Sequence, residues 1–322
     1  MVQRVIKRVV KNAYSGALWH TGALAVWLRL RPGRRRPWIL NYHHIGPKPF
    51  ESHLQCLVRR YHVISLDACC RHVAMGEPVP PNSAVLTFDD GYEQLYHELY
   101  PLLERYRAPA TAFVPTTPVD ARQPLWFNRV KAFIRSAAAP VVRVGDREFP
   151  ADGDREATYV AVMRHLNEQP VAVRDRRVAE LLDGVELPAD RMARHQPLTW
   201  EQMRAMRAWV TFGGHTRTHP WLSRLSRAEA EDEILGSKAR LEEMLGVEVR
   251  HFAYPFGSPD SFTEETVAIL RAGGFASAAM TRRGPCRVGG SPYRLPRILF
   301  DGSVGGRVVA ARLSGLWVFL TT

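Results

Sequence analysis

Residues 83–92, Ser-Ala-Val-Leu-Thr-Phe-Asp-Asp-Gly-Tyr, carry two adjacent carboxylates at the end of an apolar run. Residues 83–88 have the length and composition of a buried strand, and Gly91 starts a turn after them. Neighbouring side chains in a strand point to opposite faces, but a bend at the strand end lets Asp89 and Asp90 address one site. One carboxylate could then bind a cation while the other stays free as a base. An Asx-turn or a helix N-cap is an equally ordinary use of Asp before Gly.

The same pattern, an apolar run followed by a polar cluster, recurs on both sides of this stretch. Runs that alternate with helical segments are typical of a parallel sheet in an α/β fold. Most of the polar clusters follow the last residue of a run, and parallel α/β barrels carry their chemistry at these carboxyl ends. The pattern therefore predicts a barrel-like fold, with strands at 38–42, 61–66, 83–88, 110–114, 210–214 and 249–254.

One helix between the predicted strands is indicated in detail. Ser226-Arg227-Ala228-Glu229 is a capping box, which predicts a helix start. Ile234, Leu241 and Leu245 then form an apolar stripe, and Gly246 is a suitable residue just beyond the helix end.

Residues 118–197 fit the alternation poorly and are rich in Arg, Asp, Ala and Val. We expect a helical insertion here, with helices around 126–136 and 157–167. The insertion either forms a lid over a substrate groove or only packs on the barrel. The expected organisation is a leader at 1–36, a barrel at 37–302 that contains the insertion, and a C-terminal helix at 303–322.

The composition is that of a soluble globular protein, since 46% of the 322 residues are hydrophobic and 24% are charged. The formal net charge is +12, but nine basic residues and no acidic residue lie in 1–36, so the rest of the chain carries only +3. This nearly balanced body argues against nucleic acid as a partner. Four unevenly spaced cysteines indicate buried thiols in place of a disulfide framework: Cys56, Cys69, Cys70 and Cys286.

The leader contains an apolar stretch at 12–28 that Ser15, His20 and Thr21 interrupt. It is shorter than the roughly 20 residues that span a bilayer, and an Arg-rich segment follows it where a cleavage site would stand. We expect a basic amphipathic helix that either lies in the interface of an anionic membrane or packs on the domain's own surface. Near the C-terminus, an apolar stripe predicts a core-facing helix, with Leu313, Leu316, Trp317 and Leu320 at helical spacing.

Residues 213–220, Gly-Gly-His-Thr-Arg-Thr-His-Pro, place two histidines four residues apart, a spacing that puts both imidazoles on one face of a helical turn. Two imidazoles and one carboxylate, with open positions for water, are what a catalytic zinc ion or a similar divalent ion needs. Such a pair is often incidental, but this one follows a predicted strand. Residues 252–257, Phe-Ala-Tyr-Pro-Phe-Gly, predict a tight turn whose backbone N–H groups could face a developing oxyanion.

Three motifs, taken in their order along the chain, resemble those of the polysaccharide deacetylase family, carbohydrate esterase family 4. They are Thr-Phe-Asp-Asp-Gly at 87–91, the histidine pair at 215 and 219, and the turn at 252–257. The resemblance covers about residues 38–300. Tyr42-His43-His44-Ile45 and Leu295-Pro296-Arg297-Ile298 are similar to the branch that acts on bacterial exopolysaccharides such as poly-N-acetylglucosamine. The fold that the resemblance implies is a distorted (β/α)7 barrel.

The resemblance also implies roles for the residues that match. Asp90, His215 and His219 would bind the metal, and Asp89 would be the general base. The metal would polarise the N-acetyl carbonyl and bind water, and Asp89 would take the proton of that water. Zinc is preferred on ligand type, although cobalt, iron and nickel suit the same ligands.

The oxyanion would be held by the metal and by the backbone N–H near Phe256, with Tyr254 and Arg297 as further candidates for contact with the oxyanion or the substrate. The family often carries an arginine that orients the base where this chain has Ala253. Arg297 or Arg250 could take over that role, and reduced or lost activity is the alternative.

The general acid is the second departure from the family. Many members use a histidine in a late Leu-x-His motif, but this chain has no histidine after His251, and residues 295–297 read Leu-Pro-Arg. Arginine does not give up a proton at neutral pH. His43, at the end of the first predicted strand, is the candidate acid because it would lie on the same barrel face, and His44 and His251 are weaker candidates.

The leading hypothesis is a metal-dependent hydrolase that removes acetyl groups from N-acetylhexosamine units of a bacterial surface glycan or its lipid-linked precursor. A glycan-binding homologue with weakened catalysis and an O-acetyl esterase on a polysaccharide are the alternatives. The expected partners are an acetylated glycan and, through residues 1–36, an anionic membrane. No cleavable signal peptide is evident, so the expected location is the cytoplasm or the periphery of the inner membrane. The sequence does not indicate an oligomeric state.

Overall fold

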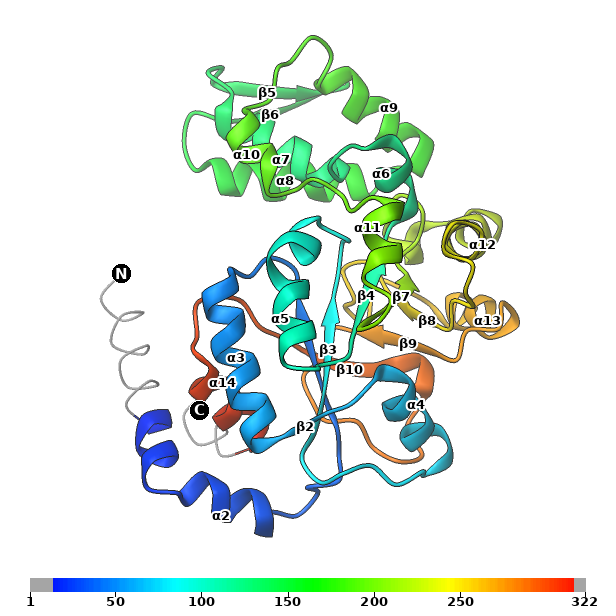
Figure 1. Ribbon diagram of the computed structural model, residues 1–322. Coiled ribbons are helices and arrows are strands. Elements are labelled where there is room, and N and C mark those ends of the chain that lie inside the picture. The colour runs from blue at the N-terminus through cyan, green and yellow to red at the C-terminus, as the bar shows by residue number, and fades with distance from the viewer. Residues whose placement is uncertain (1–13, 316–322) are drawn as a thin grey trace.

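Strand β3 (Ser83–Phe88) is buried along its whole length and pairs in parallel with a strand on each side. In the computed structural model, which describes residues 14–315, parallel pairing continues around a closed barrel of seven strands (Figure 1). The short strand β2 (His62–Val63) adds to the start of β3 from outside the ring. In order around the barrel, the strands are β1 (Trp38–Tyr42), β3, β4 (Ala110–Val114), β7 (Val210–Gly214), β8 (His251–Ala253), β9 (Ser277–Met280) and β10 (Leu295–Leu299), which pairs with β1 again.

Helices follow the strands and cover the outside of the barrel, so the predicted (β/α)7 architecture is confirmed. Short π- and 3-10-helical turns occur at η1 (Leu95–Leu99), η2 (Leu222–Arg224) and η3 (Pro292–Arg294). The α-helices of this layer are α3 (Pro47–Arg60), α4 (Leu66–Met75), α5 (Tyr100–Arg105), α6 (Thr116–Ala121), α11 (Trp200–Ala205), α12 (Arg227–Leu245), α13 (Glu264–Ala272) and α14 (Gly306–Leu313).

The predicted start and end of α12 are confirmed. The Ser226 side chain accepts from the Glu229 backbone N–H, the Glu229 carboxylate accepts from the Ser226 backbone N–H, and the helix ends before Gly246. Ile234, Leu241 and the last helical residue are buried in the main core.

Four strands have the predicted bounds, at 38–42, 83–88, 110–114 and 210–214. The runs at 61–66 and 249–254 contain shorter strands than expected, and β9 and β10 were not predicted. The sequence of β9 is Ser-Ala-Ala-Met, which lacks the branched side chains that usually identify a strand. In β10, Pro296 removes one backbone donor, a feature that normally argues against a central strand.

Side chains alternate between the two faces of each barrel strand, as the strand geometry requires. Residues such as Leu40, Leu86 and Phe252 point outward and join the core beneath the helices. Ile39, Val85 and the residues at equivalent positions in the other strands point inward. Together with residues of α4, they form an apolar floor inside the barrel. The polar residues at the strand ends therefore lie above an apolar floor.

The insertion folds as a subdomain with its own hydrophobic core over the end of the barrel that also carries the strand-end residues (Figure 1). Helices occur at both expected places, but the segment also contains an antiparallel hairpin that the sequence analysis did not predict. Its elements are α7 (Trp126–Ser136), β5 (Val141–Val144), β6 (Arg147–Pro150), α8 (Arg155–Asn167), α9 (Val171–Leu181) and α10 (Ala189–Ala193).

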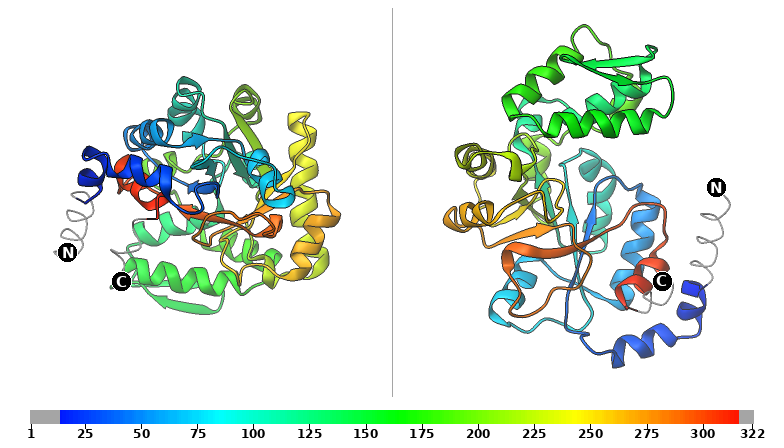
Figure 2. Two further views of the ribbon diagram at one scale, coloured as in Figure 1. Left: turned by 90° about the horizontal axis from the view of Figure 1, so that it is seen from below. Right: turned by 180° about the vertical axis from the view of Figure 1, so that it is seen from behind.

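The described part of the leader consists of two helical segments, 14–20 and α2 (Ala23–Leu30), separated by a turn, in place of one continuous helix. Leu24 and Leu28 of α2 are buried in the main core, and the Trp27 indole donates to the Ser314 carbonyl at 2.9 Å. Thus α2 packs on the domain's own surface, at the end of the barrel away from the insertion (Figure 2).

Residues 1–13 and 316–322 lie outside the described part of the chain, and with them Leu316, Trp317 and Leu320 of the predicted C-terminal stripe. Leu313, the remaining member of the stripe, is fully buried, as expected of a core-facing helix. Within residues 14–315, no helix is both long enough and apolar enough to cross a bilayer. All four cysteines are buried free thiols, as the sequence indicated.

Gly213 in β7 offers a test of barrel packing. A Cβ at this position would lie 2.7 Å from the His251 carbonyl oxygen and 2.7 Å from the Phe113 ring. Because neither neighbour can yield without a backbone shift, we expect Gly213→Ala to lower the free energy of unfolding by about 2 kcal/mol. Urea unfolding followed by circular dichroism measures the loss. Gly153→Ala is the control, since a Cβ at Gly153 meets nothing within 4 Å; equal midpoints for the two variants would contradict the packing.

Candidate active site

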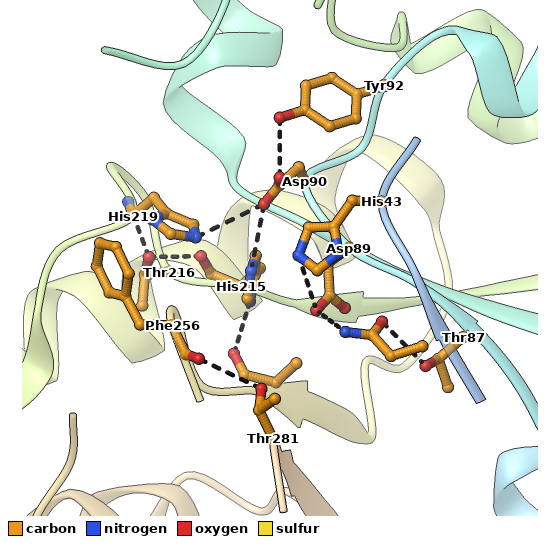
Figure 3. A network of polar contacts seen from close by, with 12 residues as sticks. His43, Thr87, Asp89, Asp90, Tyr92, His215, Thr216, His219, Phe256 and Thr281 are labelled. Atoms are coloured by element: carbon orange, nitrogen blue, oxygen red, sulfur yellow. Dashed lines mark hydrogen bonds and ion pairs between the residues drawn. The ribbon is translucent and has the colours of Figure 1, made fainter. Parts of the chain in front are cut away.

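Three buried ligand groups converge at the carboxyl ends of β3 and β7. The Nε2 atoms of His215 and His219 each lie 3.6 Å from Asp90 Oδ1, and the three ligand atoms lie within 4.8 Å of one another (Figure 3). Ligand atoms in a tetrahedral site with bonds of about 2.0–2.1 Å are roughly 3.4 Å apart. The observed separations therefore suit one divalent ion bound between the three side chains.

The conformation of Asp90 presents one carboxylate oxygen to this centre. Asp90 has a left-handed backbone (φ 68°), which turns its side chain toward the histidines instead of along the strand. Its Oδ2 accepts a hydrogen bond from the Tyr92 hydroxyl at 2.8 Å, and the Asn128 amide donates to that hydroxyl at 2.8 Å. Oδ1 is buried and has no hydrogen-bond partner among the described residues. A buried carboxylate oxygen without a donor is costly, so a cation is the partner that fits it.

His215 is oriented for metal binding through its second nitrogen. Nδ1 lies 2.7 Å from the Ala253 carbonyl oxygen, so this nitrogen carries the proton and Nε2 is left as the ligand atom. Burial lowers the pKa of His219 to about 3, so this imidazole is neutral at physiological pH. Neutral imidazoles are the form that binds metals.

The segment from His215 to His219 is an irregular loop, so the expectation of a helical turn was wrong. Thr216 and His219 both have positive φ angles, of 67° and 59°. The Glu233 carboxylate of α12 accepts from the backbone N–H groups of Arg217 and Thr218 at 2.8 and 2.9 Å. These bonds replace the helical hydrogen bonds and hold the loop in a shape that brings both imidazoles to one point.

The insertion contributes to the same loop. Arg174 of α9 is buried and donates from Nη2 to Thr218 Oγ1 at 2.9 Å, while Thr218 donates to Glu233 Oε1 at 2.6 Å. The guanidinium also packs over the Trp126 ring, 4.8 Å from its centroid. The position of the histidine loop therefore depends on α9 of the insertion as well as on α12.

Asp89 lies beside the three candidate ligands and is held by a buried arginine from β10. Arg297 donates from Nη1 to Oδ1 at 2.7 Å and from Nη2 to Oδ2 at 2.8 Å, and Asn41 donates to Oδ2 at 2.9 Å. Burial alone would raise the pKa of Asp89, but the Arg297 guanidinium and nearby histidines outweigh it and lower the pKa. Asp89 is therefore ionised at neutral pH, in the form that a base requires.

Of the two arginines considered for orienting the base, Arg297 makes this contact. Arg250 lies at the other end of β8, where its guanidinium is 3.3 Å from Asp67. His251 also contacts Asp67, at 3.2 Å, so it is remote from the site.

Two neighbouring histidines after β1 occupy different positions. His43 is 41% exposed, and its Nε2 lies 3.8 Å from Asp89 Oδ2 at the cavity wall (Figure 3). His44 stacks on Tyr92 with centroids 3.9 Å apart and lies 3.0 Å from Nδ1 of His195. Burial lowers the pKa of His44 to about 4. His44 is thus neutral at pH 7 and engaged elsewhere, which leaves His43 as the histidine beside Asp89.

A cavity of about 290 Å³ opens above these side chains. The turn after β8 forms one wall: Phe256 has a positive φ of 62°, and the Thr281 hydroxyl donates to its carbonyl at 3.2 Å. The next residue must be glycine, because a Cβ at Gly257 would lie 2.3 Å from Thr281 Oγ1. Tyr254 borders the cavity, but its hydroxyl donates to the Tyr293 carbonyl at 2.9 Å. This contact supports the turn and leaves the hydroxyl directed away from the metal ligands.

Sequence reasoning missed several residues of this site. Tyr92, Asn41 and Glu233 act by holding other residues of the site. Nothing in the sequence context of Asn41 or Glu233 distinguishes them from ordinary residues. A tyrosine directly after the Asp-Asp-Gly segment was the one available signal. The insertion also lines the cavity, through Phe127 of α7 and Tyr159 and Met163 of α8. This position favours the interpretation of the insertion as a lid over the substrate.

The comparisons with known proteins agree with this geometry. The model of the family described as "Polysaccharide deacetylase" matches residues 76–278, more than half of the chain. The chain belongs to the polysaccharide deacetylase family. It is accordingly a metal-dependent hydrolase that acts on carbon–nitrogen bonds of acetylated glycans, and the family resemblance deduced from the sequence is confirmed. A search of curated protein sequences finds no match.

Solved structures of other deacetylases share the fold. The Streptococcus pyogenes deacetylase PplD has a TM-score of 0.57 at 18% identity, over 85% of this chain and 95% of that one. IcaB from Ammonifex degensii has a TM-score of 0.56 at 20% identity, over 87% and 97%. The BpsB deacetylase domain from Bordetella bronchiseptica has a TM-score of 0.54 at 17% identity, over 84% and 98%. At these identities, the likeness shows the fold alone.

Glu233 gives the first prediction for this deacetylase. Because its carboxylate holds the histidine loop, Glu233→Ala is expected to weaken the binding of a divalent metal ion by about 10- to 100-fold. Competition between the protein and a chromophoric chelator for added zinc, used as the probe ion, measures the change. Glu231→Ala on the same helix is the control, since the Glu231 carboxylate pairs with Arg227 one turn earlier in α12. Unchanged zinc affinity in Glu233→Ala would show that the loop holds its shape without the carboxylate.

A further prediction concerns the buried pair between Arg297 and Asp89. Removing it leaves the Asp89 carboxylate buried without its cation, so Arg297→Met should cost about 3–5 kcal/mol of unfolding free energy. Chemical unfolding monitored by fluorescence measures this loss. Arg294→Met, which removes an exposed pair with Glu264, should cost no more than about 1 kcal/mol. Similar losses in both variants would mean that the buried pair contributes little.

Proposed function

We propose that this protein is a zinc-dependent N-deacetylase acting on N-acetylhexosamine units of a bacterial surface glycan, of the exopolysaccharide type. The observation that carries the proposal is the pairing, in one cavity, of the Asp90-His215-His219 cluster with the arginine-held carboxylate of Asp89. A cation centre next to a fixed, ionised base is the arrangement that amide hydrolysis by water needs.

Asp90, His215 and His219 would hold the ion. Zinc suits two imidazoles and one carboxylate with open positions; it would supply Lewis acidity toward the acetyl carbonyl and a site for the attacking water. The buried Asp90 Oδ1 without a donor supports a cation here.

The chain's own residues divide the proton transfers between them. Asp89 accepts the proton of the attacking water on a carboxylate oxygen, while Arg297 and Asn41 keep the carboxylate in place. The backbone N–H of Phe256 donates to the carbonyl oxygen as negative charge develops there. His43 donates a proton to the amine nitrogen as the C–N bond breaks, which yields acetate and a free amino sugar.

His43 suits the acid role because of its position and solvent contact. It lies 3.8 Å from Asp89 and is 41% exposed, so it can be reprotonated from water after each turnover. This arrangement replaces the late histidine that the chain lacks with one from β1, on the same side of the barrel.

The test is acetate release from N-acetylglucosamine oligomers by chelated protein with and without added zinc. We expect Asp89→Asn to bind zinc normally and to lose at least about 10³-fold in kcat, since the base is gone. His215→Ala should lose both zinc and turnover. Asp152→Asn, in an exposed loop of the insertion, is the control and should match the wild type.

The same assay separates the alternatives. His43→Ala should lose turnover while zinc binding persists, and full activity in this variant would remove His43 as the acid. If the wild type binds zinc but releases acetate only from O-acetylated glycans, the protein is an esterase. No release from any acetylated glycan would favour a glycan-binding homologue.

We also propose that α2 contacts an anionic membrane surface, which would place the enzyme at the periphery of the bacterial inner membrane. Two apolar side chains of α2 remain exposed, Val26 at 57% and Leu30 at 75%, and the exposed basic residues Arg29 and Arg34–Arg36 adjoin them. Apolar side chains beside a basic cluster suit an anionic lipid interface.

Sedimentation with vesicles tests the membrane contact. The wild type should bind vesicles that contain phosphatidylglycerol more strongly than vesicles of phosphatidylcholine alone, and the double variant Val26→Glu/Leu30→Glu should bind neither. Val247→Glu, at another exposed apolar position, is the control. Equal binding of the double variant and the wild type to anionic vesicles would refute the contact through α2.

A further inference from the structure

A second cavity is formed by the loop that joins β9 to β10, residues 281–294. Its volume is about 380 Å³, and it is lined by this loop, by the start of β10 and by Val73 of α4. In Figure 1, α4 lies at the end of the barrel away from the insertion. We call this cavity the β9–β10 pocket. Its lining contains no Asp or Glu among the described residues but four arginines: Arg282, Arg283, Arg287 and Arg294.

Most of the positive charge around the β9–β10 pocket has no acidic partner. Arg294 pairs with Glu264 of α13. Arg282, Arg283 and Arg287 are exposed and form no ion pair or hydrogen bond through their side chains with any residue between 14 and 315. Guanidinium groups that surround one cavity repel one another, and each presents a fork of N–H donors that matches phosphate oxygens. A phosphate group is therefore the ligand that this pocket suits.

The loop is fixed to the rest of the barrel at two points. The Cys286 backbone N–H donates to the Pro37 carbonyl at 2.8 Å, and the Gly289 N–H donates to the Val73 carbonyl at 3.0 Å. The Cys286 side chain is buried in the apolar floor inside the barrel. Gly289 has a positive φ of 75°, a conformation that glycine adopts without strain. These contacts hold the arginines of the loop around the cavity.

Two exposed apolar side chains lie next to the arginines. Val288, the residue after Arg287, is 57% exposed, and Met75, the last residue of α4, is 66% exposed. Val288 packs beside the residue that follows Met75, since a Cβ at Gly76 would be 3.6 Å from a Val288 methyl group. Apolar side chains beside basic residues suit an anionic membrane interface, where basic groups meet lipid phosphates and apolar groups enter the acyl boundary.

The pocket also adjoins the basic segment of the leader. Pro37, which accepts the hydrogen bond from Cys286, directly follows the exposed basic residues Arg34–Arg36. Figure 1 shows α2 and α4 at the same end of the molecule. One anionic surface can therefore meet both α2 and the β9–β10 loop.

We propose that the β9–β10 pocket binds the phosphate headgroup of an anionic phospholipid, while Val288 and Met75 enter the membrane interface. This inference extends the proposed membrane contact of α2 and rests on it for the choice of a lipid as the source of the phosphate. Stable peripheral attachment generally needs two signals, because one weak contact gives only reversible binding. Here α2 supplies one signal and the pocket the other. Together they turn the amino ends of the barrel strands toward the bilayer and the catalytic end away from it.

The first test uses single lipid molecules, so that it does not depend on a membrane surface. Dihexanoylphosphatidylglycerol, below its critical micelle concentration, is titrated into the full-length protein and followed by calorimetry. The double variant Arg283→Gln/Arg287→Gln should bind at least about 10-fold more weakly than the wild type, since it loses charged hydrogen bonds to the phosphate. Val26→Glu/Leu30→Glu should bind as the wild type does, because α2 lies outside the pocket.

The matched control is Arg176→Gln/Arg191→Gln, which makes the same change of charge on α9 and α10 of the insertion. It should retain the wild-type affinity, and thermal unfolding of every variant should match the wild type. No binding of the lipid to the wild type, or equal binding to the wild type and the Arg283→Gln/Arg287→Gln variant, would overturn the proposal.

The second test is sedimentation with vesicles that contain phosphatidylglycerol. Arg283→Gln/Arg287→Gln and Val288→Glu should each bind these vesicles at least about fivefold more weakly than the wild type. Inorganic phosphate is the comparison ligand. If it binds the pocket as tightly as the lipid does, and vesicle binding is the same with and without the arginines, the pocket takes a free phosphate and the lipid proposal is wrong.

These measurements separate the pocket from the proposed function, since none of them needs turnover. Lipid binding that depends on Arg283 and Arg287 supports the pocket, even if the α2 variant binds vesicles normally and the contact through α2 fails. Vesicle binding that depends on Val26 and Leu30 but not on the arginines would keep the contact of α2 and remove the pocket.

Discussion

The bidentate pair between Arg297 and Asp89 is the interaction on which the site depends. Its two charges lie inside the barrel, where Asn41 and Thr87 complete the polar layer and the floor beneath is apolar. A buried carboxylate is costly without a partner in good geometry. The geometry here is good because β1 stands between β3 and β10. Arg297 is in register with Ile39, and its long side chain reaches the Asp89 carboxylate just beyond the end of β3.

The sequence predicted the parts of the fold that local chemistry determines. Strands with continuous apolar runs and the helix with a capping box are identifiable from their own residues, and so are the carboxylates and histidines at strand ends. β9 and β10 are not, since small side chains and Pro296 weaken the local signal, and pairing with their neighbours determines their conformation. The sequence offered both Arg297 and Arg250 as candidates to orient the base, but it could not choose between them. The choice depends on closure of the barrel, because Asp89 lies 208 residues before Arg297 in the chain.

The histidine loop shows the same limit at a smaller scale. Spacing alone correctly indicated that His215 and His219 converge, but it suggested a helical turn. The actual shape is imposed by Glu233 from α12 and, through Thr218, by Arg174 from the insertion. Residue types as common as these give no indication of such a role, since it arises from contacts between distant segments. The insertion, which looked like an irregularity in the pattern, supports the metal loop and forms part of the cavity wall.

The origin of Arg297 in the last strand of the barrel has a consequence for folding. Asp89 lies after the second strand of the ring, so for most of the chain's synthesis its carboxylate has no guanidinium available. Only when β10 joins β1 does the base acquire its orientation and its lowered pKa. The ability to hydrolyse substrate is therefore linked to closure of the barrel. A molecule in which β10 has detached would keep Asp90 and both histidines near one another. Its Asp89 carboxylate, however, would lack both the fixed orientation and the lowered pKa that Arg297 provides.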